Sequence, residues 1–325
     1  MTRSGTFKLV RLFVSAGLIA FLIYRLDLSE VGGHLRGLAV LPLCLAALAD
    51  FGVIFINSLR WRVLLAARGI RPPQARLLYY YLVGNFFSAF LPTAVGGDVV
   101  RVVGLSAGTD RRADVFASVL VERLLGFFVL LPLGLCAIPF IGRGQVDWGV
   151  IVTVWAIAGL FFLIAFIVML RPVAARLLRI LDPLLRPFGR FKVREKIEHA
   201  YEALVSYKCC WPALVKGFLI SAVSRLFWIT GCYMVARAFS IDLDFPTLLL
   251  VVPIVELARM IPISISGIGV REATFVALLG QFGVDDTLAF TYSVVVYLVF
   301  MLFALIGGLL YSGKQLTSED MGRES

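Results

Sequence analysis

Two short stretches of the sequence combine residues that could hold an anion within an otherwise apolar chain. Residues 91–101 read LPTAVGGDVVR and residues 261–271 read IPISISGIGVR. In each stretch a proline stops an incoming helix, and glycines followed by an arginine open the next one. The first turn of a helix offers unpaired backbone N–H groups and a positive dipole end, which together bind anions. Guanidinium groups one turn further along, from Arg101 and Arg271, would suit phosphate.

The charged residues in the other apolar segments also need an explanation. Each costs about 2.5–3.5 kcal/mol at the centre of a membrane helix, so the set must be paired or functional. Five acids and five bases argue for pairing, and they are Asp50, Asp98, Glu122, Glu256 and Glu272 with Arg101, Arg123, Arg225, Arg259 and Arg271.

Sequence spacing predicts how some of these charges pair. Glu256 and Arg259 are three residues apart and can meet on one helix face. The neighbours Glu122 and Arg123 point about 100° apart around a helix, so each is expected to find its partner on another helix. The same expectation applies to Arg271 and Glu272. For Asp50, Asn57 and the Glu256/Arg259 pair, a purely structural role is an equally good interpretation.

The composition is that of an integral membrane protein. The chain has 325 residues, is 60% hydrophobic with a mean hydropathy of +0.92, and is only 16% charged, against about a quarter for soluble domains. Residues 148–170 and 287–311 carry no charge and are long enough to span a bilayer. Less uniform spans fall near residues 9–24, 38–59, 113–140 and 212–239. The net charge of +10 lies in short loops, where it signals topology rather than nucleic-acid binding.

The basic loops predict the orientation of these segments. Five arginines follow the second span without an acid, and residues 171–216 hold ten basic against four acidic residues. Both loops are therefore expected in the cytoplasm, as are both termini. This assignment requires residues 72–112 and 245–283 to return to the side from which they enter, as oppositely inserted re-entrant hairpins. Inverted repeats with broken helices are typical of secondary transporters. Two proline kinks in ordinary spans are the alternative.

The predicted fold is therefore an all-α polytopic membrane protein with six crossing helices and two re-entrant hairpins. Residues 1–315 form one transmembrane domain, and residues 316–325 form a disordered tail. Residues 171–210 are expected to include an amphipathic cytoplasmic helix, which lies on the lipid surface or packs on the bundle. Five cysteines without metal-ligand spacing indicate reduced thiols. No cofactor, metal site or catalytic residue is predicted.

Four motifs resemble a known family over about residues 8–312. They are NSLRWRVLL at 57–65, LPTAVGGDVVR at 91–101, VERL at 121–124 and IPISISGIGVRE at 261–272. The sequence is similar to the lysylphosphatidylglycerol synthase transmembrane-region family, also called the flippase-like or UPF0104 family. The resemblance implies the translocating half of proteins that make aminoacylated phosphatidylglycerol and move it to the outer leaflet. Because the chain ends shortly after its last span, the separate transferase domain is expected to be absent. The family-type polar positions are Asp98, Arg101, Glu122, Arg123, Arg271 and Glu272.

These observations favour a protein that moves an anionic or aminoacylated phospholipid, or a polyprenyl-phosphate-linked lipid, between the leaflets of the bacterial inner membrane. The predicted substrate site consists of Gly96, Gly97, Asp98, Arg101, Glu122, Arg123, Arg225, Ser266, Gly267, Gly269, Arg271 and Glu272, with helix breaks at Pro92 and Pro262. Asp50, Glu256 and Arg259 are interpreted as a proton relay or a structural pair, and Glu122 or Glu272 could also relay a proton.

Two other functional classes stay open. One is a membrane-embedded lipid transferase that uses the same carboxylates as a base. The other is a non-transporting partner of a separately encoded lipid-modifying or glycosyl enzyme. The expected partner is a membrane lipid with an anionic head group, with a neighbouring enzyme or a second copy of the chain as further partners to test.

Overall fold

The computed structural model describes residues 37–90, 96–107, 111–141, 201–259 and 267–323, with side chains to Gly313, and a few single residues at 33–35 and 149–160. Within these ranges every regular element is helical. They are α3 (Val40–Ala67), α4 (Gln74–Phe90), α5 (Gly96–Ser106), α6 (Arg112–Phe128), α7 (Leu130–Ala137), η1 (Ile138–Phe140), η3 (Tyr207–Cys209), α11 (Trp211–Ala238), α12 (Phe245–Ala258), α13 (Val270–Gly280) and α14 (Asp286–Arg323).

Four helices are long and apolar enough to cross a membrane. They are Val40–Ala67, Arg112–Phe140, Trp211–Ala238 and Asp286–Gly313, each 28 or 29 residues long. A helix of that length rises about 42 Å, more than the hydrocarbon core requires. They coincide with four of the six predicted spans. The predicted spans at residues 9–24 and 148–170 fall wholly or largely outside the described residues.

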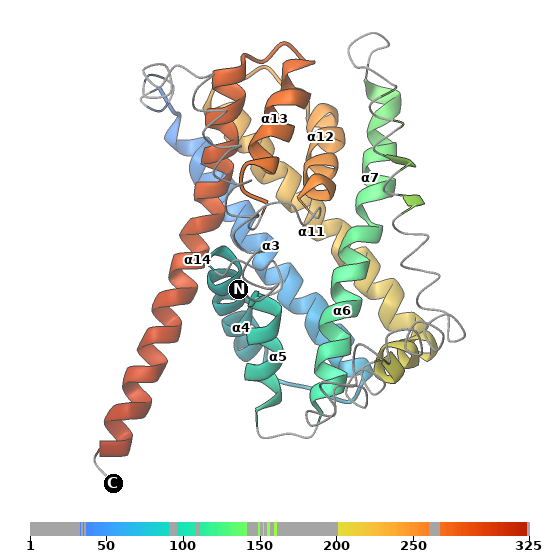
Figure 1. Cartoon of the computed structure of the whole chain (residues 1–325), viewed down its shortest axis with the longest axis vertical. Coiled ribbons are helices and arrows are strands. Elements are labelled where there is room, and N and C mark those ends of the chain that lie inside the picture. Colours follow the sequence, from blue (N-terminus) through green and yellow to red (C-terminus); the bar gives the residue numbers. More distant parts are fainter. Residues whose placement is uncertain are drawn as a thin grey trace, which may run out of the picture.

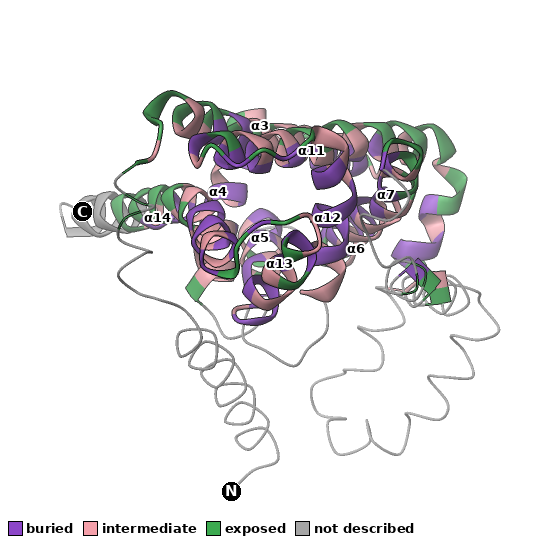
Figure 2. Ribbon diagram, turned by 90° about the horizontal axis from the view of Figure 1, so that it is seen from above, coloured by how far each residue is buried: buried purple, intermediate pink, exposed green. Residues whose placement is uncertain are grey.

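Helices α3 and α11 run antiparallel and form one side of the molecule (Figures 1 and 2). At one end the backbone N–H of Ala39 donates to the carbonyl of Ala238 at 3.1 Å. At the other end the hydroxyl of Tyr207, just before α11, donates to the carbonyl of Leu64 at 2.9 Å. The two helices therefore stay in contact over nearly their whole length and provide a rigid wall for the shorter helices.

Two helical pairs stand against this wall. The pair α4–α5 occupies the lower half of Figure 1 and the pair α12–α13 the upper half, so the ends that connect each pair point toward the middle of the bundle. A Cβ atom added to Gly97, at the start of α5, would lie 2.1 Å from the carbonyl oxygen of Gly84 on α4, which is too close for any side chain. Here glycine is required because two helices cross at backbone contact, and not because a ligand must approach.

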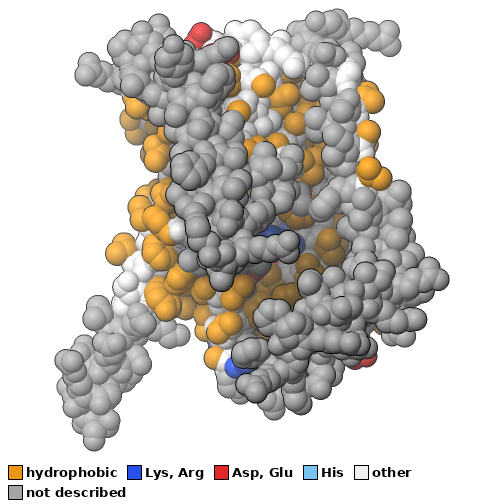
Figure 3. Space-filling model, in the orientation of Figure 1, with side chains coloured by type: hydrophobic (Ala, Val, Ile, Leu, Met, Phe, Trp, Pro, Cys, Tyr) orange, Lys and Arg blue, Asp and Glu red, His pale blue; other side chains and the backbone are white. Residues whose placement is uncertain are grey.

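The apolar packing has two main parts. One centre gathers side chains of α11, α12, α13 and α14 around the fully buried Tyr292 and Leu250, and the other surrounds Trp61 between α3, α4 and α6. On the outer surface, Leu41, Phe140 and Leu309 are each more than 70% exposed. Figure 3 shows hydrophobic side chains over much of the visible face of the described part. A surface of this kind suits contact with lipid chains.

One feature differs from the sequence-based expectation, and a second prediction is covered only in part by the described residues. Helix α14 continues to Arg323, although a disordered tail was expected from residue 316. A long apolar helix supplies the nucleus, and tail residues such as Lys314, Gln315 and Glu319 extend it at little cost because they favour helix. The predicted amphipathic segment 171–210 is described only from Tyr201, where a helical turn precedes η3.

Candidate functional site

Glu122 on α6 is the centre of a buried ion cluster. Its Oε1 accepts a bond of 2.8 Å from Nη2 of Arg60 on α3, and its Oε2 accepts one from Nη2 of Arg101 on α5. The three side chains are 3–8% exposed. Arg60 also donates to the hydroxyl of Ser221 on α11 at 2.8 Å. One carboxylate therefore connects three helices and, through Arg60, a fourth.

Asp98, near the start of α5, extends this cluster. Its Oδ1 lies 3.4 Å from Nη1 of Arg101, and its Oδ2 lies 2.7 Å from Nε of Arg123. Asp98 stands in the first turn of α5, where a carboxylate also interacts favourably with the helix dipole. Arg123 is 38% exposed, so the cluster reaches the surface of the described structure here.

Two aromatic rings hold the guanidinium of Arg101. Its Cζ lies 4.3 Å from the ring centroid of Trp61 and 3.8 Å from that of Tyr81. The indole N–H of Trp61 is itself fixed by a 2.9 Å bond to the hydroxyl of Ser118. Desolvated cation–π contacts of this kind contribute about 2 kcal/mol each. The position of Arg101 is thus determined by rings as well as by carboxylates.

A second ion cluster lies where α12 ends. Glu256 accepts a bond of 2.7 Å from Nη1 of Arg259 and one of 3.4 Å from Nη1 of Arg225 on α11. The predicted pairing of Glu256 with Arg259 is confirmed, and Arg225 is its additional partner. Gly267, with φ of +79°, lies against the stem of Arg259, so a side chain there would displace that arginine.

A third pair lies at the start of α13. Arg271 donates from Nη2 to Oε1 of Glu272, and the Cζ of Arg271 stands 4.2 Å from the ring centroid of Tyr297 on α14. These neighbours were predicted to pair with residues on other helices. That prediction is wrong, because Arg271 and Glu272 form an ion pair with each other. Both residues lie in the first helical turn, where the long arginine side chain can reach round to the next residue.

The N-terminus of α13 is partly closed by its own residues. The N–H of Gly269 donates to Oε2 of Glu272 at 2.7 Å, and the N–H of Arg271 donates to the carbonyl of Gly267 at 2.9 Å. Fewer unpaired backbone N–H groups are therefore left at this helix end than the sequence predicted. Gly269 itself has φ of +86°, a conformation that favours glycine.

The first two clusters meet at Gly126 on α6. A Cβ atom added to Gly126 would lie 3.4 Å from Nη1 of Arg60 and 3.5 Å from Nη2 of Arg225. The Nε of Arg225 also donates to the Gly126 carbonyl at 3.4 Å. A glycine on α6 thus lets guanidinium groups from α3 and α11 come together. Figure 3 shows basic side chains at mid-height, close to hydrophobic ones.

Among the described residues, the ion pairs of these clusters involve more arginines than carboxylates. They join four carboxylates, Asp98, Glu122, Glu256 and Glu272, to six arginines, Arg60, Arg101, Arg123, Arg225, Arg259 and Arg271. Nε of four of these arginines is buried without a hydrogen-bond acceptor: Arg60, Arg101, Arg259 and Arg271. Buried donors without acceptors are costly, so an anionic ligand that accepts from them would be favoured.

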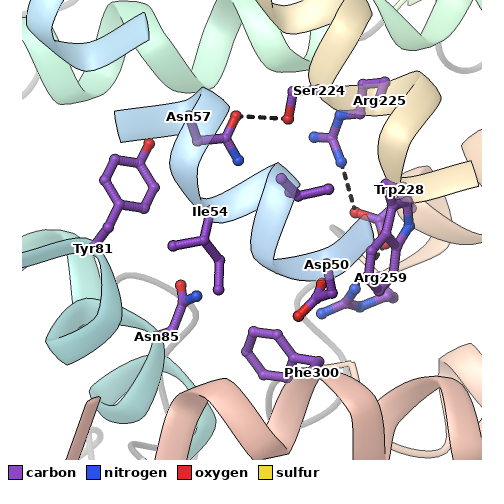
Figure 4. A pocket seen from close by; sticks show the side chains of 12 residues that line it. Asp50, Ile54, Asn57, Tyr81, Asn85, Ser224, Arg225, Trp228, Arg259 and Phe300 are labelled. Carbon is purple, nitrogen blue, oxygen red and sulfur yellow. Dashed lines mark hydrogen bonds and ion pairs between the residues drawn. The ribbon is translucent and has the colours of Figure 1, made fainter. Parts of the chain in front are cut away.

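A cavity of about 160 Å³ adjoins the second cluster (Figure 4). Asp50 and Asn57 reach it from α3, Ser224 and Arg225 from α11, and Arg259 from the end of α12. Ser224 donates to Oδ1 of Asn57 at 2.8 Å. Asp50 is 4% exposed, and its Oδ2 has no hydrogen-bond partner. The cavity therefore joins an unpaired carboxylate to an arginine-rich wall.

Most of the predicted site residues that the structure describes lie in or beside this network. Glu122 and Arg123 have partners on other helices, as predicted. Arg101 and Arg271 pair with different carboxylates and contact different aromatic rings. Their joint contact with one anion therefore stays a prediction. Gly96 and Gly97 open α5 as expected. Pro92, Pro262 and Ser266 fall outside the described residues.

Arg60 is the main residue that the sequence interpretation missed. Its position among five arginines after a predicted span assigned it to a cytoplasmic loop, but α3 continues to Ala67 and buries it. Helical spacing from Asn57 to Arg60 and Trp61 could have indicated one polar and aromatic face. The roles of Tyr81 and Tyr297 had no such signal, because an aromatic residue in an apolar helix is ordinary.

Fold and site together define a helical membrane protein with a buried arginine–carboxylate network. Residues 8–308 match the family described as the lysylphosphatidylglycerol synthase TM region, and the chain belongs to that family. Two proteins of Methanothermobacter thermautotrophicus, both called UPF0104 membrane protein, are similar to it. One is 23% identical over 97% of this chain and 96% of its own length, and the other is 24% identical over 94% and 95%.

Proposed function

We propose that this protein moves a lipid with an anionic head group from one membrane leaflet to the other. The observation that carries the proposal is the surplus of arginine in the ion pairs of the described residues, where six arginines, three of them buried, share four carboxylates. Such a surplus is expensive in a membrane unless an anion relieves it. The substrate class is an anionic or aminoacylated phospholipid, or a polyprenyl-phosphate-linked lipid.

The chemistry of the free donors supports phosphate as the ligand. Guanidinium groups bind phosphate through two parallel N–H bonds, and charge-assisted bonds of this type are about twice as strong as neutral ones. Arg101 and Arg259 each keep a buried Nε without an acceptor. A phosphate that enters beside either arginine could accept from Nε without displacing the carboxylate on Nη.

The arrangement of the helical pairs supports a transport role. In this proposal α4–α5 enters from the cytoplasmic side and α12–α13 from the other side, as re-entrant hairpins of an inverted repeat. The arginine-rich end of α3 marks the cytoplasmic side, because short basic loops stay there. Broken helices of opposite orientation place transporter binding sites near the bilayer midplane. In the same proposal the chain does not alter its lipid chemically.

Reconstituted vesicles test this proposal directly. Purified protein is placed in phosphatidylcholine vesicles with a trace of fluorescent phosphatidylglycerol, and dithionite is added outside. We expect the fluorescence of the inner leaflet to be lost at a protein-dependent rate, more slowly for Arg101→Gln and unchanged for Arg68→Gln. Arg68 is the matched control because it pairs with Asp114 outside the network.

The outcomes separate the three functional classes. If bleaching stops once the outer leaflet is consumed, as in vesicles without protein, the chain does not move this lipid. If chromatography of the recovered lipid shows a covalent change, the transferase class is supported instead. If the protein neither exchanges nor modifies the lipid, a role as a partner of another enzyme is favoured.

A further inference from the structure

Asp50 differs from every other acid of the buried network because it has no basic partner. Its side chain is 4% exposed, its Oδ2 has no hydrogen-bond donor, and no ion pair to it occurs within the described residues. Asp98, Glu122, Glu256 and Glu272 each bind at least one arginine. An ionised carboxylate without donors is unfavourable at this depth, whereas its protonated form is tolerated.

Asp50 points into the cavity that Arg259 and Arg225 also line (Figure 4). Each of these arginines binds Glu256 through an Nη atom, and neither forms an ion pair with Asp50 among the described residues. The cavity of about 160 Å³ that the three side chains line provides the space for a ligand group. A phosphate oxygen there could accept from a guanidinium N–H of Arg225 or Arg259, while a second oxygen could accept only from a protonated Asp50.

From this geometry we propose that the cavity binds a phosphodiester head group together with one proton, and that the proton is held by Asp50. This inference rests on the proposed lipid transport and names how the same site would be coupled to pH. Protonation removes the negative charge that would repel the phosphate and converts Asp50 Oδ2 into a donor. When the phosphate leaves, the proton leaves with it, so charge and protons balance in each cycle.

The other groups that face Asp50 do not replace it in this role. From α4 the cavity receives Tyr81, and from α12 Glu256, whose two oxygens are already used by Arg225 and Arg259. From α11 come Arg225 and, near Asp50, the buried thiol of Cys232. The lining residue from α14 is Phe300, which does not titrate. Asp50 is therefore the acid of this cavity whose proton is not in competition with an arginine.

Binding of one probe at several pH values tests the proposal. The probe is dioctanoyl phosphatidylglycerol, whose phosphodiester stays singly charged between pH 5 and pH 9, added to the full chain in detergent. If one proton binds with each head group, affinity should fall as pH rises, approaching about tenfold per pH unit. Asp50→Asn should bind the probe with an affinity that does not change with pH.

Controls keep other titrating groups apart from Asp50. Asp114 lies in the first turn of α6 beside Arg68, so Asp114→Asn should keep the wild-type dependence of affinity on pH. Unbuffered wild-type protein should take up protons when the probe is added, which tests the idea even if Asp50→Asn fails to fold. Glycerophosphoglycerol in place of the probe decides whether a soluble phosphodiester or only a lipid is bound.

Four results would overturn the proposal. The first is a wild-type affinity that does not change with pH, and the second is the same dependence of affinity on pH in Asp50→Asn as in the wild type. The third is release of protons on binding. The fourth is selective, pH-independent binding of dioctanoyl phosphatidylethanolamine, which would make Asp50 an acceptor for an ammonium group. Leaflet exchange measured in parallel separates the two claims. If leaflet exchange occurs but the affinity for the probe does not change with pH, the transport proposal stands without the proton site. If binding depends on pH but no exchange occurs, only the proton site stands. No binding at all removes both.

Discussion

Arg60 and Glu122 form a buried ion pair of 2.8 Å although 62 residues separate them in the sequence. The pair joins α3 to α6 in the part of the molecule where the first helical hairpin ends. Because Glu122 also binds Arg101, its single negative charge is shared by arginines from two different helices. The carboxylate is therefore both a structural junction and the group that sets how much positive charge is left for a ligand.

Replacing Glu122 with Gln should strongly destabilise the protein. Two buried guanidinium groups would lose their counter-ion, and breaking a buried pair costs about 3–5 kcal/mol. Thermal aggregation in detergent, followed by gel filtration, should show a clear decrease in stability. The comparison variant is Asp114→Asn, whose partner Arg68 is 25% exposed, where about 1 kcal/mol or less is expected. Equal shifts in the two variants would contradict a central role for Glu122.

Helix positions followed from the sequence better than helix partners did. Charge-free or nearly charge-free stretches identified the four long helices because a membrane span needs about 20 apolar residues. The predicted Pro/Gly breaks also lie between α4 and α5 and between α12 and α13, although Pro92 and Pro262 themselves fall outside the described residues. These features are local, so a single sequence contains them.

The site was predictable only in part, because ion pairs between helices depend on rotation and tilt. The pairing of Glu256 with Arg259 follows from a spacing of three on one helix. The partners of Arg101 come from three other helices, α3, α4 and α6, and no spacing rule relates them. Arg60 was misplaced because an arginine near a helix end looks the same in sequence whether it faces the cytoplasm or the bundle.

A double-mutant cycle should show that Glu256 and Arg259 act as a unit. Glu256→Gln leaves two arginines without their carboxylate, whereas Arg259→Gln leaves Glu256 still paired with Arg225. The first variant should therefore lose more folded yield than the second. Combining them should cost less than the sum of the two, with a coupling free energy of about 0.5–3 kcal/mol. Simple additivity would mean that each residue serves a different partner.

Gly97→Ala should disrupt the first hairpin. The new Cβ would overlap the Gly84 carbonyl and the Ser88 hydroxyl, so α4 and α5 would have to separate and carry Arg101 away from Glu122. We expect lower stability and loss of leaflet exchange. Gly231→Ala on α11 is the matched control, since its Cβ would make only ordinary contacts of 3.6 Å. Wild-type behaviour of Gly97→Ala would show that the close helix crossing is unnecessary.

Accessibility of cysteines should establish the orientation. In a cysteine-free background, Asp242→Cys at the loop after α11 should react with an impermeant maleimide from outside intact cells. A single cysteine restored at position 209, the last residue of η3, should react only after permeabilisation. Both positions are exposed in the structure. Labelling of position 242 only from the cytoplasm would reverse the orientation and remove the topology argument for the second re-entrant hairpin.

Arg101→Lys tests whether the network binds an anion or merely holds helices together. Without Arg101, Glu122 keeps Arg60 and Asp98 keeps Arg123, so each carboxylate retains an arginine and the fold should survive. An ammonium group, however, cannot reproduce the contacts of a planar guanidinium with Trp61 and Tyr81 while offering a two-pronged donor to phosphate. One charge-assisted bond contributes about 1.5–3 kcal/mol, so leaflet exchange of fluorescent phosphatidylglycerol should slow by about tenfold or more. Arg68→Lys should leave the rate unchanged. A folded Arg101→Lys protein with the wild-type rate would assign Arg101 to packing and leave the cavity beside Arg225 and Arg259 as the anion site.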